Sequence, residues 1–216
     1  MALTLHSMWR ATAPYRVRIG LNLKGLSYDY VAHDLVGGEA RRAPYIDLNR
    51  QGLVPALETD DGVMTQSLAI LEWLEETHPQ PPLLPAKPRD RATVRAMAEI
   101  VACDIHPLNN LCVLQAIEGL GVAAGSEPQR AWVHRWIAAG FDALEPMIQR
   151  HGRGFSFGAE PGFADCFLIP QVYGANRFSL DLAPYPAIRA VVERAAEHPA
   201  FLAAHPDKQP DAPRLP

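Results

Sequence analysis

The chain has 216 residues, of which 48% are hydrophobic and 20% charged, a balance typical of a globular protein that excludes a disordered or fibrous one. The formal net charge is −4 and the longest basic cluster is Arg41-Arg42, which argues against binding to nucleic acid. No apolar run approaches the roughly 20 residues that a membrane span requires, so we expect no membrane partner. A small-molecule ligand is the favoured partner.

The amino terminus lacks the positively charged segment and apolar stretch of a secretory signal, so we expect a cytoplasmic protein. Three cysteines, Cys103, Cys112 and Cys166, form no CxxC pair and no cysteine–histidine spacing that suits a metal. The odd count favours reduced thiols over disulfides. We therefore expect cysteines buried in the core and no metal site.

The first elements alternate between strand and helix patterns. Residues 3–6 alternate apolar and polar side chains as a short strand does, and residues 14–24 carry apolar side chains at helical spacing. Pro14 suits the first turn of that helix and Gly25 suits its end. Residues 28–32 alternate again, and a strand there would lie parallel to the first across a right-handed crossover. These segments predict one β-α-β unit.

A second group of elements follows a loop rich in Gly, Arg and Pro. Residues 54–59 and 63–65 flank the turn Asp60-Asp61-Gly62, which predicts a β-hairpin. Residues 67–77 place their large apolar side chains on one face, which predicts a helix that ends at His78-Pro79.

Four prolines between residues 80 and 88 leave no room for a regular element and predict a linker. Beyond it, apolar residues recur every three or four positions with almost no strand signal. We therefore predict an α/β domain at residues 1–82, a linker at 83–90 and an all-helical bundle domain at 91–216.

Val54-Pro55 is expected where a loop enters an edge strand, because a proline fits there only if its missing N–H faces no partner strand. A cis peptide bond would leave the backbone N–H and C=O of Val54 to pair with an extended peptide. A trans proline in an ordinary edge loop is the alternative.

Gln66-Ser67 begins the helix predicted at residues 67–77. The Ser67 hydroxyl and the first N–H groups of this helix would bind a carboxylate. Serine is also a preferred N-cap residue, so the alternative is that Ser67 only caps its own helix.

The element order, the segment LVPAL (53–57), Gln66-Ser67, the Pro-rich linker and the helical second domain together resemble the cytosolic glutathione S-transferases over nearly the whole chain. Three further segments resemble the zeta class of that family: RVRIGLNLKGL (16–26), DIHPLNN (104–110) and HPDKQPD (205–211). The resemblance implies a thioredoxin-like first domain that binds glutathione, a helical domain that binds substrate, and a cytosolic homodimer.

The zeta class contains maleylacetoacetate and maleylpyruvate isomerases. The resemblance therefore implies a glutathione-dependent cis-trans isomerase of a small, acidic, unsaturated dicarboxylic keto acid, as used in aromatic catabolism. A glutathione thiolate adds to the cis double bond, the resulting single bond rotates, and elimination returns the trans product. The thiol pKa must fall from about 8.5, which a hydroxyl donor and a helix N-terminus can achieve. The resemblance places glutathione on Gln51, Val54, Gln66 and Ser67.

The segment expected to activate the thiol departs from the family pattern. The family has Arg-Ser-Ser-Cys or a close variant before the first helix, whereas this chain has Arg10-Ala11-Thr12-Ala13. Ala11 and Ala13 carry no hydroxyl or thiol donor, so Thr12 is the hydroxyl left to contact the thiolate. The alternative is that Thr12 is simply the helix N-cap.

The resemblance implies substrate contacts from both predicted domains. Arg10 and Arg177 match family arginines that would hold the ends of a dicarboxylate, although Arg10 on its own could be an exposed surface arginine. His106 and Asn110 lie four residues apart, and a helix kinked at Pro107 would direct both into the site, His106 toward glutathione and Asn110 toward substrate. The alternative for His106 is a packed, hydrogen-bonded helix histidine.

Two other functions stay open. The maleylpyruvate isomerases carry a further arginine where this chain has Leu111-Cys112, and an altered substrate choice would favour conjugation of glutathione to an electrophile or dehalogenation of an α-halo acid. The alanines on either side of Thr12 would instead suit a protein that binds glutathione without turnover. Asp165, after Gly162, matches the family's local capping motif and is assigned to folding.

Overall fold

The computed structural model describes residues 2–213, which divide into two compact units. Residues up to Leu83 and residues from Ala196 onward form the first unit, and Leu84–Ala195 form the second. The first unit contains a small sheet, and the second is built from helices. The sequence predicted that the helical domain extends to residue 216, whereas the segment after Ala195 belongs to the sheet unit.

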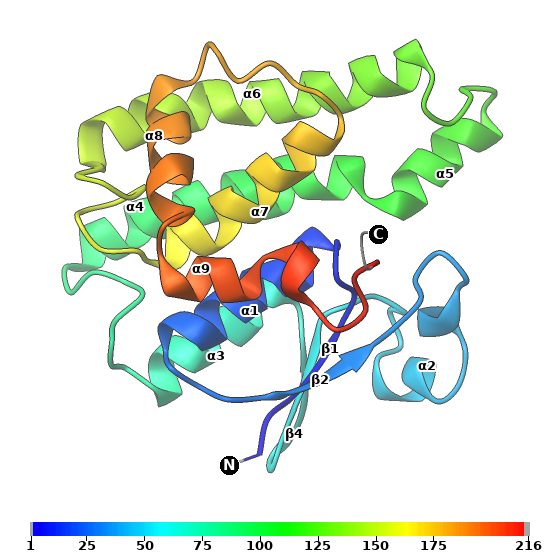
Figure 1. Cartoon of the computed structure of the whole chain (residues 1–216), viewed down its shortest axis with the longest axis horizontal. Coiled ribbons are helices and arrows are strands. Elements are labelled where there is room, and N and C mark those ends of the chain that lie inside the picture. The colour runs from blue at the N-terminus through cyan, green and yellow to red at the C-terminus, as the bar shows by residue number, and fades with distance from the viewer. Residues whose placement is uncertain (1, 214–216) are drawn as a thin grey trace. The chain divides into compact units, whose positions relative to one another are not determined.

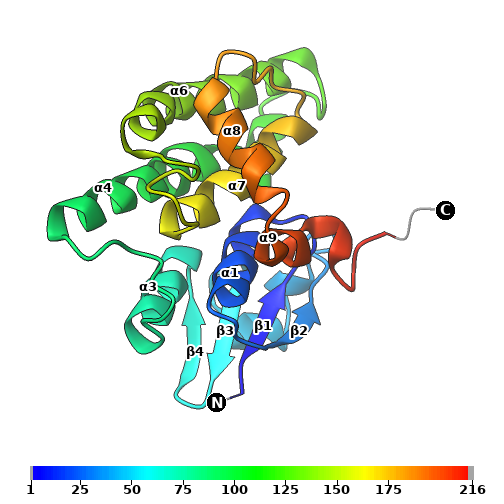
Figure 2. The same ribbon diagram turned by 60° about the vertical axis from the view of Figure 1, so that its left-hand side comes forward.

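A four-stranded sheet of order β2-β1-β3-β4 forms the centre of the first unit (Figure 1), and Figure 2 labels all four strands in this order. β1 (Thr4–Ser7) pairs parallel with β2 (Asp29–Ala32) and antiparallel with β3 (Ala56–Thr59), which pairs antiparallel with β4 (Gly62–Thr65). The predicted β-α-β unit and β-hairpin are therefore confirmed.

The expectation that Val54-Pro55 enters an edge strand was wrong. β3 lies between β1 and β4, so it is an interior strand. Pro55 is compatible with this position because it precedes Ala56, the first residue of the strand, and its missing N–H interrupts no ladder hydrogen bond.

Two helices pack on one another in the first unit (Figure 2). α1 (Thr12–Leu23) ends before Gly25, whose positive φ of 66° is the left-handed stop predicted from the sequence. α3 (Ser67–Thr77) keeps the predicted bounds. The two helices approach closely at Gly20, where a Cβ would lie 2.2 Å from Leu71 Cδ2. A glycine at this position is therefore a packing requirement.

The loop between β2 and β3 contains two short elements that the sequence did not predict. They are the 3-10 turn η1 (Glu39–Arg41) and α2 (Tyr45–Leu48). Neither is long enough to show helical periodicity, which explains why they were missed. Tyr45 is buried and anchors α2 to the rest of the unit.

The carboxyl-terminal segment packs on α1. It contains α9 (Pro199–Ala204) and the 3-10 turn η4 (Pro206–Lys208). Arg18 of α1, which is fully buried, donates from Nε to the carbonyl of Ala204 at 3.0 Å, and Asn22 Nδ2 donates to the carbonyl of Ala200 at 2.9 Å. These bonds explain why the last segment belongs to the sheet unit.

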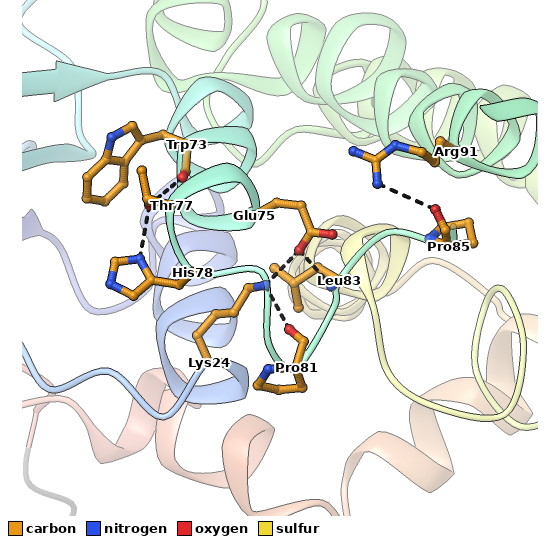
Figure 3. A network of polar contacts seen from close by, with 9 residues as sticks. All are labelled: Lys24, Trp73, Glu75, Thr77, His78, Pro81, Leu83, Pro85 and Arg91. Carbon is orange, nitrogen blue, oxygen red and sulfur yellow. Dashed lines mark hydrogen bonds and ion pairs between the residues drawn. The ribbon is translucent and has the colours of Figure 1, made fainter. Parts of the chain in front are cut away.

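A buried ion pair joins α1, α3 and the Pro-rich segment (Figure 3). Lys24 Nζ lies 2.6 Å from Glu75 Oε2 and 2.7 Å from the carbonyl oxygen of Pro81. The backbone N–H of Leu83 donates to the same Glu75 oxygen at 2.8 Å. Buried charges are costly unless they are paired, and here both charges have partners.

The second unit is a bundle of helices. Its elements are α4 (Pro88–Glu99), the π-helical segment η2 (Ile100–Ile105), the 3-10 turn η3 (His106–Asn109), α5 (Leu111–Gly119), α6 (Glu127–His151), α7 (Phe163–Arg177) and α8 (Pro186–Ala195). α7 is buried along almost its whole length and packs on α4. Gly140 of α6 allows close contact with η2, because a Cβ there would lie 2.2 Å from Ile105 Cδ1.

Asp165 fixes the start of α7. Its carboxylate is buried and accepts the backbone N–H groups of Ser156 and Gly162, each at 2.8 Å. Gly162 is the N-cap and has no side chain, so the carboxylate supplies half of a capping box. Burial raises the pKa of Asp165, and the hydrogen bonds from Ser156 and Gly162 oppose that rise.

The expectation that the cysteines are buried is confirmed only in part. None is in a disulfide, and Cys166 is buried as expected, but Cys103 and Cys112 are exposed. Both exposed cysteines lie in Pro88–Gly119, a helical run that is long and apolar enough by composition to cross a membrane. Helices of soluble proteins pass that test as well, and the run is interrupted by the 3-10 turn η3.

Candidate functional site

The turn between β1 and α1 carries Arg10 and Thr12. Ala11 is the N-cap of α1, its N–H donates to the carbonyl of Met8 at 3.0 Å, and Thr12 is the first helical residue. Thr12 is therefore not the N-cap itself, which removes the alternative role considered for it. Its position is the positive end of the α1 dipole, where a thiolate would be stabilised.

Arg10 is half-buried at the same turn. Its guanidinium carbon lies 5.8 Å from the centre of the Trp9 ring, a distance that suits a cation–π contact. This contact positions a fixed positive charge two residues before Thr12.

Val54 lies at the entrance to β3, and its bond to Pro55 is cis, as the sequence suggested. The preceding carbonyl, that of Leu53, is fixed by two donors: the Tyr45 hydroxyl at 2.6 Å and Asn49 Nδ2 at 2.7 Å. Val54 itself is buried in a small cluster with Met8 and Tyr45. The backbone that would pair with an extended peptide is thus held in place from outside the sheet.

Gln51 and Gln66 meet at the turn into α3. Gln66 Nε2 donates to Gln51 Oε1 at 2.8 Å, so two of the residues predicted to bind glutathione are brought together. Gln66 has a positive φ of 70°, a region that residues other than glycine rarely adopt. Such backbone strain is concentrated at functional sites, where the surrounding structure maintains it.

Ser67 is buried at the first position of α3, after the N-cap Gln66. Its Oγ accepts a hydrogen bond from Arg16 Nη1 at 3.2 Å. The position after the N-cap does not fit the alternative in which Ser67 caps its own helix. The site therefore combines a hydroxyl, a helix N-terminus and a buried guanidinium, all of which favour an anion.

Arg16 was not predicted as a site residue. It is buried with 2% of its surface exposed, and it reaches α3 from α1. The available signal was the pair Arg16 and Arg18 within an otherwise apolar helical stretch, because buried arginines need specific partners. Their partners come from distant segments, which a local pattern does not identify.

His6, His33 and two glutamates form a chain of titratable groups beside Tyr45. His6 Nδ1 and His33 Nε2 are 2.8 Å apart, His6 Nε2 lies 2.5 Å from Glu58 Oε1, and His33 Nδ1 lies 3.5 Å from Glu39 Oε1. The Tyr45 ring lies 4.3 Å from the His33 ring, centre to centre. Burial and the neighbouring His6 lower the pKa of His33, and Glu39 opposes that fall.

His106 and Asn110 are arranged differently from the prediction. A helix kinked at Pro107 was expected to stack the two residues one turn apart. Instead, η3 ends at Asn109, and Asn110 is extended with φ −65° and ψ 148°. The Asn110 side chain accepts the N–H of Cys112 at 3.3 Å and caps α5. Pro107, which has no N–H to donate, accounts for the break in the α-helix.

Arg177 is the last residue of α7 and is exposed, whereas Arg10 belongs to the sheet unit. Each is positioned within its own unit by a helix end. Within residues 2–213, no group of three or more His, Cys, Asp or Glu side chains is arranged to hold a metal ion.

Comparison with known proteins agrees with this arrangement. The family model "Glutathione S-transferase, N-terminal domain" matches residues 13–82, and "Glutathione S-transferase, C-terminal domain" matches residues 130–194. A maleylacetoacetate isomerase of Pseudomonas aeruginosa is 47% identical over 97% of this chain and 98% of its own length. A maleylpyruvate isomerase of a Ralstonia species is 47% identical over 96% of this chain and 99% of its own.

Solved structures give the same result. The holo structure of a bacterial zeta-class maleylpyruvate isomerase superposes with a TM-score of 0.94 at 46% identity, covering 97% of this chain and 100% of that chain. The structure of a maleylacetoacetate isomerase from Anaeromyxobacter dehalogenans with bound glutathione gives 0.89 at 46% identity, covering 98% of each chain.

A thioredoxin-like sheet unit with a cis-proline before β3, combined with a helical unit, is the architecture of the cytosolic transferases that use glutathione. The chain belongs to the glutathione S-transferase family. The resemblance to its zeta class and the predicted fold class are both confirmed.

Proposed function

We propose that the protein is a glutathione-dependent cis-trans isomerase of a small unsaturated dicarboxylic keto acid, of the maleylacetoacetate or maleylpyruvate type. The observation that carries this proposal is the 47% identity over almost the whole chain to two enzymes bearing those names. Glutathione is the cofactor, in line with the family and with the glutathione bound in a related structure.

Glutathione binds the sheet unit in this proposal. The backbone of Val54 pairs with the cysteinyl unit, as a peptide pairs with a strand. Gln66 and Ser67 hold the γ-glutamyl carboxylate at the N-terminus of α3, where Arg16 adds a positive charge behind Ser67. Gln51 orients Gln66 through their 2.8 Å hydrogen bond, and His106 provides a contact from the helical unit.

The sulfur is placed at the N-terminus of α1. Thr12 donates its hydroxyl to the thiolate, and the helix dipole lowers the thiol pKa further. The thiolate adds to the cis double bond, and the electron pair of that bond moves onto the conjugated carbonyl as an enolate. After rotation about the new single bond, the enolate reforms the double bond and expels the thiolate. Glutathione is therefore regenerated in every turnover.

The substrate is held by cations in this scheme. Arg10, beside the thiolate, stabilises the enolate oxygen and one carboxylate, since a guanidinium binds oxyanions through paired hydrogen bonds. Arg177 binds the other carboxylate, and Asn110 contacts substrate with the part of its amide that does not cap α5.

The test is turnover of maleylpyruvate and maleylacetoacetate with glutathione present far below the substrate concentration. Isomerisation converts many substrate molecules per glutathione and leaves total glutathione unchanged. S-methylglutathione is the matched control, because it can occupy the site but has no thiol to add. Absence of trans product with both substrates contradicts the proposal.

Two alternative functions follow from specific residues. Leu111-Cys112, in place of an arginine found in the maleylpyruvate isomerases, favours conjugation or dehalogenation of another electrophile. Ala11 and Ala13 favour a protein that binds glutathione without turnover. The same assay distinguishes them, because conjugation consumes one glutathione per product, and a binding protein gives a calorimetric signal without product.

The protein acts in this proposal as a cytoplasmic homodimer. The exposed thiols Cys103 and Cys112 suit a reducing compartment. Leu111 and Leu120 expose large apolar side chains on and beside α5, a surface that a second copy would cover. Light scattering at micromolar concentration should give about twice the chain mass of 23.7 kDa, and a mass near 23.7 kDa contradicts the dimer.

A further inference from the structure

The two peptide groups that flank Trp9 are each held by a charged side chain. Its N–H donates to Asp211 Oδ2 at 2.9 Å, and its carbonyl accepts a hydrogen bond from Arg18 Nη2 at 2.9 Å. Asp211 lies 202 residues further along the chain, in the segment that follows η4. The carboxyl-terminal segment thus contacts the backbone of the turn that leads into α1.

The second oxygen of Asp211 is also engaged. The Tyr30 hydroxyl donates to Asp211 Oδ1 at 2.7 Å, which fixes the orientation of the carboxylate. Burial raises the pKa of Tyr30, a side-chain hydrogen bond with Ser7 opposes that rise and the bond to Asp211 adds to it, so the hydroxyl stays protonated and keeps its donor role. Asp211 therefore connects β2 to the turn.

Arg18, which binds the Trp9 carbonyl, also has several partners. Besides Trp9, its guanidinium donates to Ser7 Oγ at 3.0 Å and to the carbonyl of Ala204 at 3.0 Å. It is fully buried, so each of these bonds is protected from water. Both backbone polar groups of Trp9, one in each flanking peptide, are therefore bound by charged side chains that have further partners.

These hydrogen bonds to Trp9 determine the positions of Arg10 and Thr12 in the site. Arg10 follows Trp9 directly, and Thr12 lies three residues after it. Rotation of either flanking peptide group breaks a charge-assisted hydrogen bond, so both backbone torsions of Trp9 are restrained. The direction in which the chain leaves Trp9 is thus set by Asp211 and Arg18, and a misplacement of about 1 Å at a reacting group can cost about a hundredfold in rate.

We propose that Asp211 is a positioning residue of the thiol-activating turn, and that it acts through the backbone of Trp9 on Arg10 and Thr12. The effect on turnover rests on the isomerase function proposed above. The effect on the turn does not, because it concerns the free protein.

Asp211→Ala is the first test, compared with Asp207→Asn as the matched control. Asp207 lies in the same segment and is exposed, and its carboxylate lies 3.6 Å from His205 Nδ1. Asp211→Ala should speed amide hydrogen exchange in residues 8–12 about tenfold or more without a matching change in α9. It should lower kcat about tenfold or more and raise the thiol pKa of bound glutathione, with little change in KM. Asp207→Asn should resemble the wild type.

Asp211→Asn is the conservative variant. The amide oxygen of this variant still accepts the Trp9 N–H, so most of the kcat and exchange protection lost in Asp211→Ala should be retained. If Asp211 acted only through its negative charge, Asp211→Asn would instead resemble Asp211→Ala. Exchange in residues 8–12 that is the same in Asp211→Ala and Asp207→Asn overturns the proposal, as does a wild-type kcat and thiol pKa in Asp211→Ala. If the wild type isomerises neither acid, the proposed function fails while the exchange result still decides the role of Asp211.

Should Asp211→Ala fail to fold, Tyr30→Phe replaces it. This variant removes the hydroxyl that orients the carboxylate and leaves the Asp211 charge in place. It should show the same faster exchange in residues 8–12 to a smaller extent, and wild-type exchange there overturns the proposal.

Discussion

Replacement of Lys24 by methionine tests the buried ion pair of the sheet unit. The Lys24 side chain is 0% exposed and the Glu75 side chain 6% exposed, so the variant leaves a buried carboxylate that keeps the hydrogen bond from the Leu83 N–H at 2.8 Å but loses its cation. Removal of one member of a buried pair costs about 3–5 kcal/mol. Since about 1 kcal/mol lowers the melting temperature of a chain of this size by about 2–4 °C, Lys24→Met should lower Tm by about 10 °C.

Urea unfolding followed by circular dichroism measures the free energies. Lys24→Met combined with Glu75→Leu should be less destabilising than Lys24→Met alone, because no unpaired charge is then buried. Glu193→Gln is the control, since Glu193 and Arg189 are exposed and 4.0 Å apart, and a surface pair contributes about 1 kcal/mol or less. If Lys24→Met costs no more than Glu193→Gln, the burial argument is wrong.

Two further predictions concern the site, and a third concerns the pH dependence of stability. Ser67→Ala should weaken glutathione binding about tenfold to a hundredfold by calorimetry, because one charge-assisted hydrogen bond contributes about 1.5–3 kcal/mol; an unchanged Kd would remove Ser67 from the site. Arg177→Ala should mainly raise KM, whereas Arg10→Ala should lower kcat about a hundredfold, with partial recovery in Arg10→Lys; a full kcat in Arg10→Ala contradicts its role. Because the pKa of His33 is lowered in the folded protein, the unfolded chain binds a proton at His33 more readily than the folded chain does. The stability that neutral His33 contributes is therefore complete above about pH 6.5, the pKa of an unperturbed histidine. It is lost as the pH falls through the lower folded-state pKa. Urea titrations from pH 7.5 to 5 should show that decline, and His33→Asn should reduce it; an equal slope in both proteins would exclude His33 as its source.

The elements that the sequence predicted well are those with local causes. The start and end of α3 follow from its apolar face and from His78-Pro79, and the end of α1 follows from Gly25. The hairpin follows from Asp60-Asp61-Gly62, whose turn chemistry needs no tertiary contact.

The features that the sequence did not predict depend on contacts between distant segments. The interior position of β3 is set by its pairing with β1, and alternation of side chains does not specify which strands are neighbours. The packing of the carboxyl-terminal segment on α1 depends on the bond between Arg18 and Ala204, which are 186 residues apart. A Pro-kinked helix was also the wrong expectation at Pro107, because Asn110 caps a new helix instead of continuing the old one.

The buried cations of α1 and of its C-cap Lys24 explain how the N-termini of α1 and α3 keep a fixed position relative to one another. Arg16 binds Ser67 at the start of α3, Arg18 binds the backbone of Trp9, and Lys24 binds Glu75. A shift of α1 by one residue would bury three cations without partners, at a cost far above that of rearranged apolar contacts. Apolar packing between α1 and α3 would tolerate such a shift more readily, since it is not directional. The distance between Thr12 and Ser67 is therefore fixed by these directional hydrogen bonds and the ion pair. In the proposed site, this distance has to match the length of the γ-glutamyl-cysteinyl arm of glutathione.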